Sequence, residues 1–135
     1  MQSNRIRISL TFSFRGETFT PTAELDLNEC MQKFDGTPNL YDVLAEQIGI
    51  DEFQYEYDVM TMEEIKFDHI EGFVADYIED GSFDAEDFAK RWHEEQAIDE
   101  IQVIAKQHLS IDNLTEHPET KSALFAAYHY GRKYQ

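Results

Sequence analysis

Residues 5–14 of this chain read RIRISLTFSF, in which polar and apolar side chains alternate without a break. Successive side chains of a β-strand point to opposite faces, so this period of two predicts a strand with one buried face. The glycine at position 16 suits a tight turn, and residues 19–27 then alternate in the same way. We therefore expect a long N-terminal β-hairpin over about residues 5–27. Pro21 has no N–H to donate, which places its strand at a sheet edge or in a bulge.

The next part of the chain predicts a helix followed by a second hairpin. The pair Thr37-Pro38 suits a helix start, with Thr37 as the cap, and Gly49 suits a helix end. Apolar residues between them share one face, which predicts a helix over about residues 38–48. Apolar and polar residues then alternate in two short runs, which predict a second hairpin over about residues 53–69.

The second half of the chain shows helical periodicity. Apolar residues spaced by three and four predict helices over about residues 70–79, 84–109 and 118–130. In the middle helix the apolar face rotates, which predicts a break or kink between His93 and Ala97. The order of elements indicates an α+β fold in a single domain, residues 1–135. It combines an antiparallel sheet from two β-hairpins, helices packed on one face, and a mostly helical C-terminal half.

The composition excludes several classes of protein. Ten Phe, seven Tyr and a hydrophobic fraction of 41% are typical of a chain that buries a core. No apolar run approaches the roughly 18 residues of a membrane span, and the N-terminus lacks the apolar stretch of a secretory signal. A single cysteine, Cys30, excludes an internal disulfide and a cysteine-based zinc cluster, and we expect it to be a buried structural thiol. We expect a cytoplasmic protein that does not contact membranes.

The net charge of −17 is concentrated in the middle of the chain. All 28 acidic residues lie between Glu17 and Glu119, together with only five of the 11 Lys and Arg residues. Residues 51–100 alone hold 18 acids and three bases. The net charge exceeds the magnitude of about 2–8 that suits a small domain, and it repels nucleic acid while it attracts basic surfaces. A solubility surface is the simpler explanation, but the clustering of the acids indicates a partner.

We therefore predict a small interaction or regulatory protein that binds a basic protein partner through an acidic face and needs no cofactor. Carboxylates that share one face would imitate the phosphates of a duplex, so one such partner is a nucleic-acid-binding protein. Direct binding to nucleic acid is not expected. The predicted face consists of Asp51, Glu52, Glu56, Asp58, Glu63, Glu64, Asp76, Glu79, Asp80, Glu86, Asp87, Glu94, Glu95, Asp99 and Glu100.

Residues 76–87 resemble a degenerate EF-hand calcium loop. Gly81 falls at the turn glycine of such a loop. Ile78, however, replaces an oxygen ligand, and the last acid is an aspartate instead of the usual glutamate. A helix that stops at Gly81 and a second helix capped by Asp84 explain the same residues without a metal. The acids that match ligand positions are Asp76, Asp80, Asp84 and Asp87.

The sequence contains no catalytic motif. It has no Gly-x-Ser-x-Gly sequence, no glycine-rich phosphate loop and no His-Glu-x-x-His pair. An enzyme is the first alternative, and it would need a pocket that gathers His69, His93 or a face with Tyr55 and Tyr57. A second alternative is a structural subunit that dimerises through the edge of the N-terminal hairpin. Three arginines of that hairpin would then meet acids of another copy: Arg5, Arg7 and Arg15.

Overall fold

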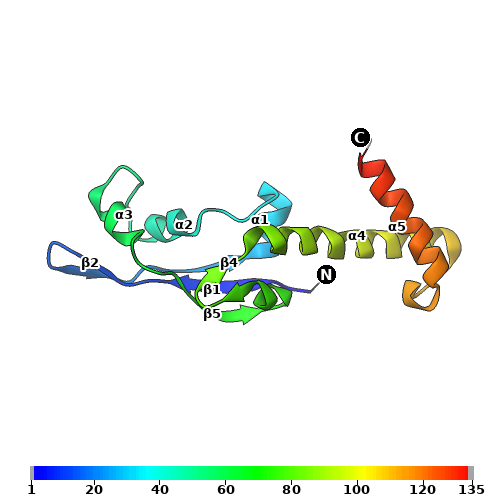
Figure 1. Ribbon diagram of the computed structural model, residues 1–135, viewed down its shortest axis with the longest axis horizontal. Coiled ribbons are helices and arrows are strands. Elements are labelled where there is room, and N and C mark those ends of the chain that lie inside the picture. Colours follow the sequence, from blue (N-terminus) through cyan, green and yellow to red (C-terminus); the bar gives the residue numbers. More distant parts are fainter. Residues whose placement is uncertain (1, 134–135) are drawn as a thin grey trace. The chain divides into compact units, whose positions relative to one another are not determined.

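The computed structural model describes residues 2–133 and has the predicted α+β class (Figure 1). Residues Gln2–Ala89 form one compact unit, and residues from Lys90 onward form another. The first unit contains the sheets, whereas the second is helical. That the chain folds as a single domain stays a prediction.

The N-terminal hairpin forms over its predicted length. Strand β1 (Arg5–Ser9) pairs with β4 (Thr22–Asp26), and β2 (Phe12–Phe14) pairs with β3 (Glu17–Phe19) in the same continuous register. The turn is Arg15-Gly16, with φ values of 52° and 80°, and such a pair of positive φ angles matches the twist of the two strands.

Pro21 interrupts the ladder of this hairpin. Leu10 donates its N–H to the carbonyl of Pro21 at 3.3 Å, but Pro21 has no N–H to return. Beyond the interruption, β1 lies at the centre of a three-stranded antiparallel sheet in the order β4-β1-β5, with β5 spanning Lys66–Glu71. The strand that follows Pro21 is therefore an edge strand, as predicted.

One face of β1 is buried, as its alternation predicts. Ile6 and Ile8 are almost completely inaccessible, whereas Arg5 is exposed. Helices α1 (Leu27–Phe34) and α2 (Leu40–Gln47) both contact β1 and β4 and supply the buried side chains that cover this face. Each fully buried aliphatic or aromatic side chain contributes about 1.5–3 kcal/mol.

Helix α2 begins two residues later than predicted. Asn39 caps it, because its Oδ1 accepts hydrogen bonds from the N–H groups of Tyr41 at 2.9 Å and Asp42 at 3.3 Å. Thr37 therefore does not cap this helix. Asparagine is at least as favourable a cap as threonine, so the nearer residue takes the position.

The first half of the second predicted hairpin is helical instead. Residues Tyr55–Met60 form helix α3. Two side chains turn the backbone before it: Asp51 Oδ1 accepts from the N–H of Phe53 at 2.9 Å, and Gln54 Oε1 accepts from the N–H of Asp51 at 2.8 Å. Such local side-chain bonds compete with strand pairing, so β5 pairs with β1 rather than with residues 53–59.

The predicted helix over residues 70–79 is also absent. β5 runs to Glu71, Gly72 adopts a φ of 94°, and a short 3₁₀ helix, η1, covers Phe73–Tyr77. A small hairpin of β6 (Ile78–Glu79) and β7 (Ser82–Phe83) follows. Pairing with β1 overrides the helical spacing of the apolar residues, because a strand at this position completes the sheet.

Helix α4 (Ala85–Leu109) is continuous, so a break between His93 and Ala97 is wrong, and a kink there stays a prediction. Asp84 caps it as predicted, with its Oδ1 accepting from the N–H of Asp87 at 3.1 Å. Phe88 is buried in the first unit, and Ile101 lies in the core of the second.

The second unit packs the end of α4 against η2 (Leu114–Glu116) and α5 (Pro118–Lys133). Gln102 on α4 fixes the intervening turn, donating to the carbonyl of Ile111 at 3.0 Å and accepting from the N–H of Leu114 at 2.9 Å. Among residues 2–133, no helix is both long and apolar enough to span a bilayer. The core of this unit consists of Ile101, Ala105 and Leu114 with half-buried Ile111, Leu124, Phe125 and Tyr128.

Candidate functional site

A pocket between α2 and α3, here called the acidic pocket, gathers four carboxylates. Two of them, Asp51 and Glu52, belong to the predicted acidic face, and Asp42 and Glu46 on α2 do not. The pocket has a volume of about 470 Å³, within the range of about 300–1,000 Å³ that is common for ligand sites. Its other lining residues are Ala45, Gly49, Ile50, Phe53 and Tyr57.

The sequence between the two helices shapes this pocket. Gly49 follows the end of α2 with a φ of 71°, a conformation that glycine adopts without strain. The bonds from Asp51 Oδ1 and Gln54 Oε1 to backbone N–H groups then hold the turn that leads into α3. Asp51 and Glu52 lie on this turn, and its two hydrogen bonds keep them beside α2.

Tyr57 and Asp42 form the polar contact between the two helices. The Tyr57 hydroxyl donates to Asp42 Oδ1 at 2.6 Å. This hydrogen bond, followed by burial and the negative charge of Asp42, raises the pKa of Tyr57 to about 12. The phenol therefore stays neutral at physiological pH, and it holds one carboxylate of the pocket in a fixed position.

Phe53 lies at the rim of the acidic pocket and is 89% exposed. An aromatic ring exposed to this degree beside a pocket is unusual, because burying it would be favourable by about 1.5–3 kcal/mol. No lysine, arginine or histidine is among the described residues that line the pocket. The pocket therefore combines unneutralised negative charge with an accessible aromatic face.

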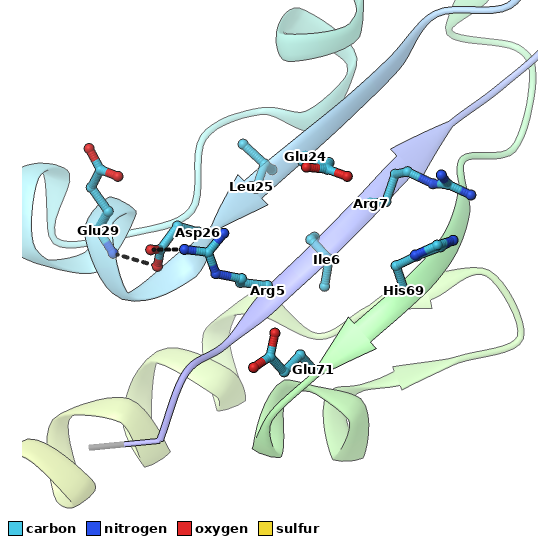
Figure 2. A pocket seen from close by; sticks show the side chains of 9 residues that line it. All are labelled: Arg5, Ile6, Arg7, Glu24, Leu25, Asp26, Glu29, His69 and Glu71. Carbon is cyan, nitrogen blue, oxygen red and sulfur yellow. Dashed lines mark hydrogen bonds and ion pairs between the residues drawn. The ribbon is translucent and has the colours of Figure 1, made fainter.

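A second pocket, of about 430 Å³, lies on the polar face of the three-stranded sheet (Figure 2). Here each arginine of β1 stands between two acids: Arg5 pairs in register with Asp26 and Glu71, and Arg7 pairs with Glu24 and Asp68. Arg5 Nη2 lies 3.4 Å from Asp26 Oδ2. Unlike the acidic pocket, this one contains two arginines of the chain itself, an arrangement typical of cross-strand pairs that stabilise a sheet.

A β-bulge in β5 places His69 at this second pocket. The register between β1 and β5 shifts between Arg5 and Arg7, and His69 adopts a φ of 47°. Bulges of this kind redirect a side chain and bend a strand. His69 therefore lies beside Arg7 in this second pocket (Figure 2), whereas Tyr57 lines the acidic pocket. The structure does not bring these two candidates of the enzyme alternative into one pocket.

The segment that resembles an EF-hand loop forms a hairpin instead. β6 pairs with β7 across the two-residue turn Asp80-Gly81, where φ is 50° and 76°. The acids of this segment lie around a pocket of about 440 Å³, yet among residues 2–133 no three His, Cys, Asp or Glu side chains are placed to hold a metal ion. The pocket is lined by Asp76, Tyr77, Glu79, Asp80, Ser82, Asp84 and Asp87.

The remaining predicted acids are spread over the chain. Glu64 lines an apolar pocket of about 360 Å³ beside β5. Glu56 and Asp58 are on α3, Glu63 lies in the loop before β5, and Glu86 is in the first turn of α4. Glu94, Glu95, Asp99 and Glu100 are on the part of α4 that belongs to the second unit, as is His93.

Cys30 is buried, as expected for a structural thiol. Burial raises the pKa of its thiol, and the nearby carboxylates of Asp26 and Glu29 raise it further. A thiol with a raised pKa is a poor nucleophile at neutral pH, because little thiolate is present.

Comparison of the chain with protein-family models, with curated proteins and with solved structures finds no match.

Proposed function

We propose that this protein binds a basic segment of a partner protein in the acidic pocket between α2 and α3. The observation that carries this proposal is the composition of the pocket: four carboxylates, no basic side chain, and Phe53 exposed at the rim. Such a site suits an arginine or lysine side chain, which gains charge-assisted hydrogen bonds from the acids and a cation–π contact from the ring.

The contrast with the second pocket, on the polar face of the three-stranded sheet, supports this interpretation. There, Arg5 and Arg7 of β1 lie opposite acids of the neighbouring strands, so those charges serve the register of the sheet. In the acidic pocket the same type of residue has no basic neighbour among the lining residues. Carboxylates that bind an external cation need this arrangement, because an internal ion pair would compete with the ligand.

A peptide titration tests this proposal. The probe is a fluorescein-labelled octapeptide with four arginines, compared with the same peptide in which citrulline replaces arginine and so removes the charge. We expect the arginine peptide to bind, and its affinity to fall between about 50 mM and about 300 mM salt, because salt screens exposed charges. The citrulline peptide should bind at least about tenfold more weakly, since a lost charged hydrogen bond costs about 1.5–3 kcal/mol.

Variants then locate the binding site. Two variants should each weaken binding of the arginine peptide about threefold to tenfold. One is the double variant Glu46→Gln with Glu52→Gln, and the other is Phe53→Ser. Matched controls lie outside the pocket: Glu116→Gln with Glu119→Gln also removes two exposed acids, and Met62→Ser removes a side chain that is 83% exposed. The proposal would be disproved if the citrulline peptide bound as tightly as the arginine peptide. It would also be disproved if the control variants lost as much affinity as the pocket variants.

A further inference from the structure

We infer that the free edge of β4 receives an extended basic segment of a partner protein as an antiparallel fourth strand of the sheet. This inference does not rest on the acidic pocket. It concerns a different surface of the same unit, and it depends on main-chain hydrogen bonds instead of a side-chain pocket.

The hydrogen bonds of the hairpin fix which groups of β4 are free. Leu10 N–H bonds to the carbonyl of Pro21 at one end of the ladder, and Leu27 N–H bonds to the carbonyl of Asn4 at 2.8 Å at the other end. Bonded and non-bonded pairs alternate along an antiparallel ladder, so Thr22 and Glu24 turn their N–H and C=O groups away from β1. Among residues 2–133, no backbone group bonds to them on that side.

The two edges of the sheet differ in how they resist pairing. β5 carries a lysine, Lys66, and the bulge at His69, which are devices that block the addition of another strand. β4 has no lysine and no bulge, and its register with β1 is regular over all five residues. β4 is therefore the edge on which a further strand fits.

A groove runs beside β4 on the side of α1. It has a volume of about 240 Å³ and is lined by β4 together with Cys30, Lys33 and Phe34 of α1. Phe34 is 73% exposed, and it offers an apolar contact to alternate side chains of an added strand. Glu24 lines both this groove and the pocket on the polar face of the sheet, and Figure 2 shows it on β4 beside β1.

Charge selects the occupant of this edge. Lys33 pairs with Glu29, and Arg5 pairs with Asp26. Glu24 lies in the middle of the strand, opposite Arg7, whose two side-chain hydrogen bonds go to Asp68. A second copy paired antiparallel about Glu24 would set two glutamates opposite each other, which is unfavourable. The strand that fits has a lysine or arginine opposite Glu24 on the polar face of the sheet. On the opposite face of the sheet it has an apolar residue that contacts Phe34.

A decapeptide of alternating lysine and valine tests this inference, with two N-methylated forms as probes. In an antiparallel fourth strand the lysines lie opposite Thr22 and Glu24. The backbone N–H groups of the lysines therefore face β4, and the backbone N–H groups of the valines face solvent. Methylation of the backbone nitrogens of the lysines should abolish binding. Methylation of the backbone nitrogens of the valines should leave binding unchanged, although both peptides carry the same charge.

Amide hydrogen exchange locates the contact. With the unmethylated peptide near saturation, exchange at Thr22 and Glu24 should slow by about tenfold or more, since both amides become hydrogen-bonded. Glu24→Gln and Phe34→Ser should weaken binding, whereas Phe53→Ser, which tests the acidic pocket, should not. Equal binding of both methylated peptides, protection at β5 instead of β4, or loss of binding only on valine methylation would overturn the inference.

Discussion

The guanidinium of Arg7 and the carboxylate of Asp68 form a two-bond ion pair between strands that are 61 residues apart in the chain. Arg7 Nε lies 2.7 Å from Asp68 Oδ1, and Nη2 lies 2.8 Å from Oδ2. The two residues are direct partners in the register of β1 and β5. A slip of one residue would turn every side chain of β5 to the opposite face, so this pair helps to specify the register.

Replacing Asp68 with asparagine should remove a pH-dependent part of the stability. The hydrogen bond from Arg7 lowers the pKa of Asp68 in the folded protein below its unfolded value of about 3.9. A lowered pKa stabilises the fold above the unfolded pKa, and this contribution is lost as the pH falls through the folded pKa. Urea unfolding should therefore show the variant less stable at about pH 6, and the difference should shrink as the pH falls below about 3.9.

Arg7→Lys serves as the companion variant, because lysine keeps the charge but cannot form both bonds. It should fall between the parent and Asp68→Asn in its melting temperature, and all differences should stay within a few degrees, since the pair is exposed to solvent. A stability difference for Asp68→Asn that persists unchanged at about pH 2 would show that its cause is not this ion pair.

Gly72→Ala should be among the most destabilising substitutions in the first unit. A Cβ at this position would lie 2.0 Å from the carbonyl oxygen of Ser3 and 2.6 Å from Asn4 Oδ1, and the backbone φ is 94°. Because the neighbouring atoms are largely backbone, the chain itself must move, which we expect to cost about 3 kcal/mol or more. Chemical unfolding monitored by circular dichroism measures the loss.

Gly16→Ala is the matched control for this substitution. Gly16 also has a positive φ, of 80°, but no atom lies within 4 Å of the added Cβ. It should cost only the conformational penalty of about 1–2 kcal/mol. Similar losses at both positions would mean that the close approach of Gly72 to Ser3 contributes nothing.

Asn4→Ala should also destabilise the first unit, through lost hydrogen bonds. Asn4 is completely buried, donates to the side chain of Asn28 at 3.0 Å, and accepts from the N–H of Val74 at 3.0 Å. Truncation leaves these partners unpaired, at a cost of about 3 kcal/mol. Asn28→Ala, at a less buried position, should cost about 1 kcal/mol, and a larger loss at Asn28 than at Asn4 would contradict this ranking.

The part of the fold that local patterns determine could be predicted from the sequence. The N-terminal hairpin follows from alternation on both strands and from the glycine at its turn, all within residues 5–27. Strand β5 could not be predicted in its true pairing, because its partner is β1, far away in the chain. The apolar spacing from Ile70 to Ile78 fits a helix equally well, and only contacts such as that between Asn4 and Val74 decide against it.

The candidate site was predicted in part. Charge density indicated Asp51 and Glu52, but Asp42 and Glu46 lie where acids are sparser, and only the packing of α2 brings them to the same pocket. The alternation of apolar and polar residues predicts that Phe53 lies in a strand of the second hairpin. Its exposure follows from the turn that Asp51 and Gln54 stabilise, which a period of two does not reveal.

Tyr57→Phe should change the response of the protein to alkaline pH. The hydrogen bond to Asp42 raises the pKa of Tyr57 to about 12, whereas the unfolded chain has a tyrosine pKa of about 10. A raised pKa favours the neutral phenol in the folded state, so the stabilisation is complete below about pH 10 and is lost as the pH rises through about 12. Because Tyr57 is only half-buried, we expect the substitution to cost about 0.5–1 kcal/mol at neutral pH.

The ultraviolet absorbance of tyrosinate measures this directly. In a spectrophotometric titration of the folded protein, Tyr57→Phe should remove one group from the highest part of the curve and leave the rest unchanged. Tyr55→Phe is the control, because Tyr55 is 74% exposed on the same helix. Asp42→Asn should move the titration of Tyr57 toward about pH 10, since the negative charge and the strongest acceptor are removed. A titration that Asp42→Asn leaves unchanged would mean that this hydrogen bond does not join α2 to α3 in solution.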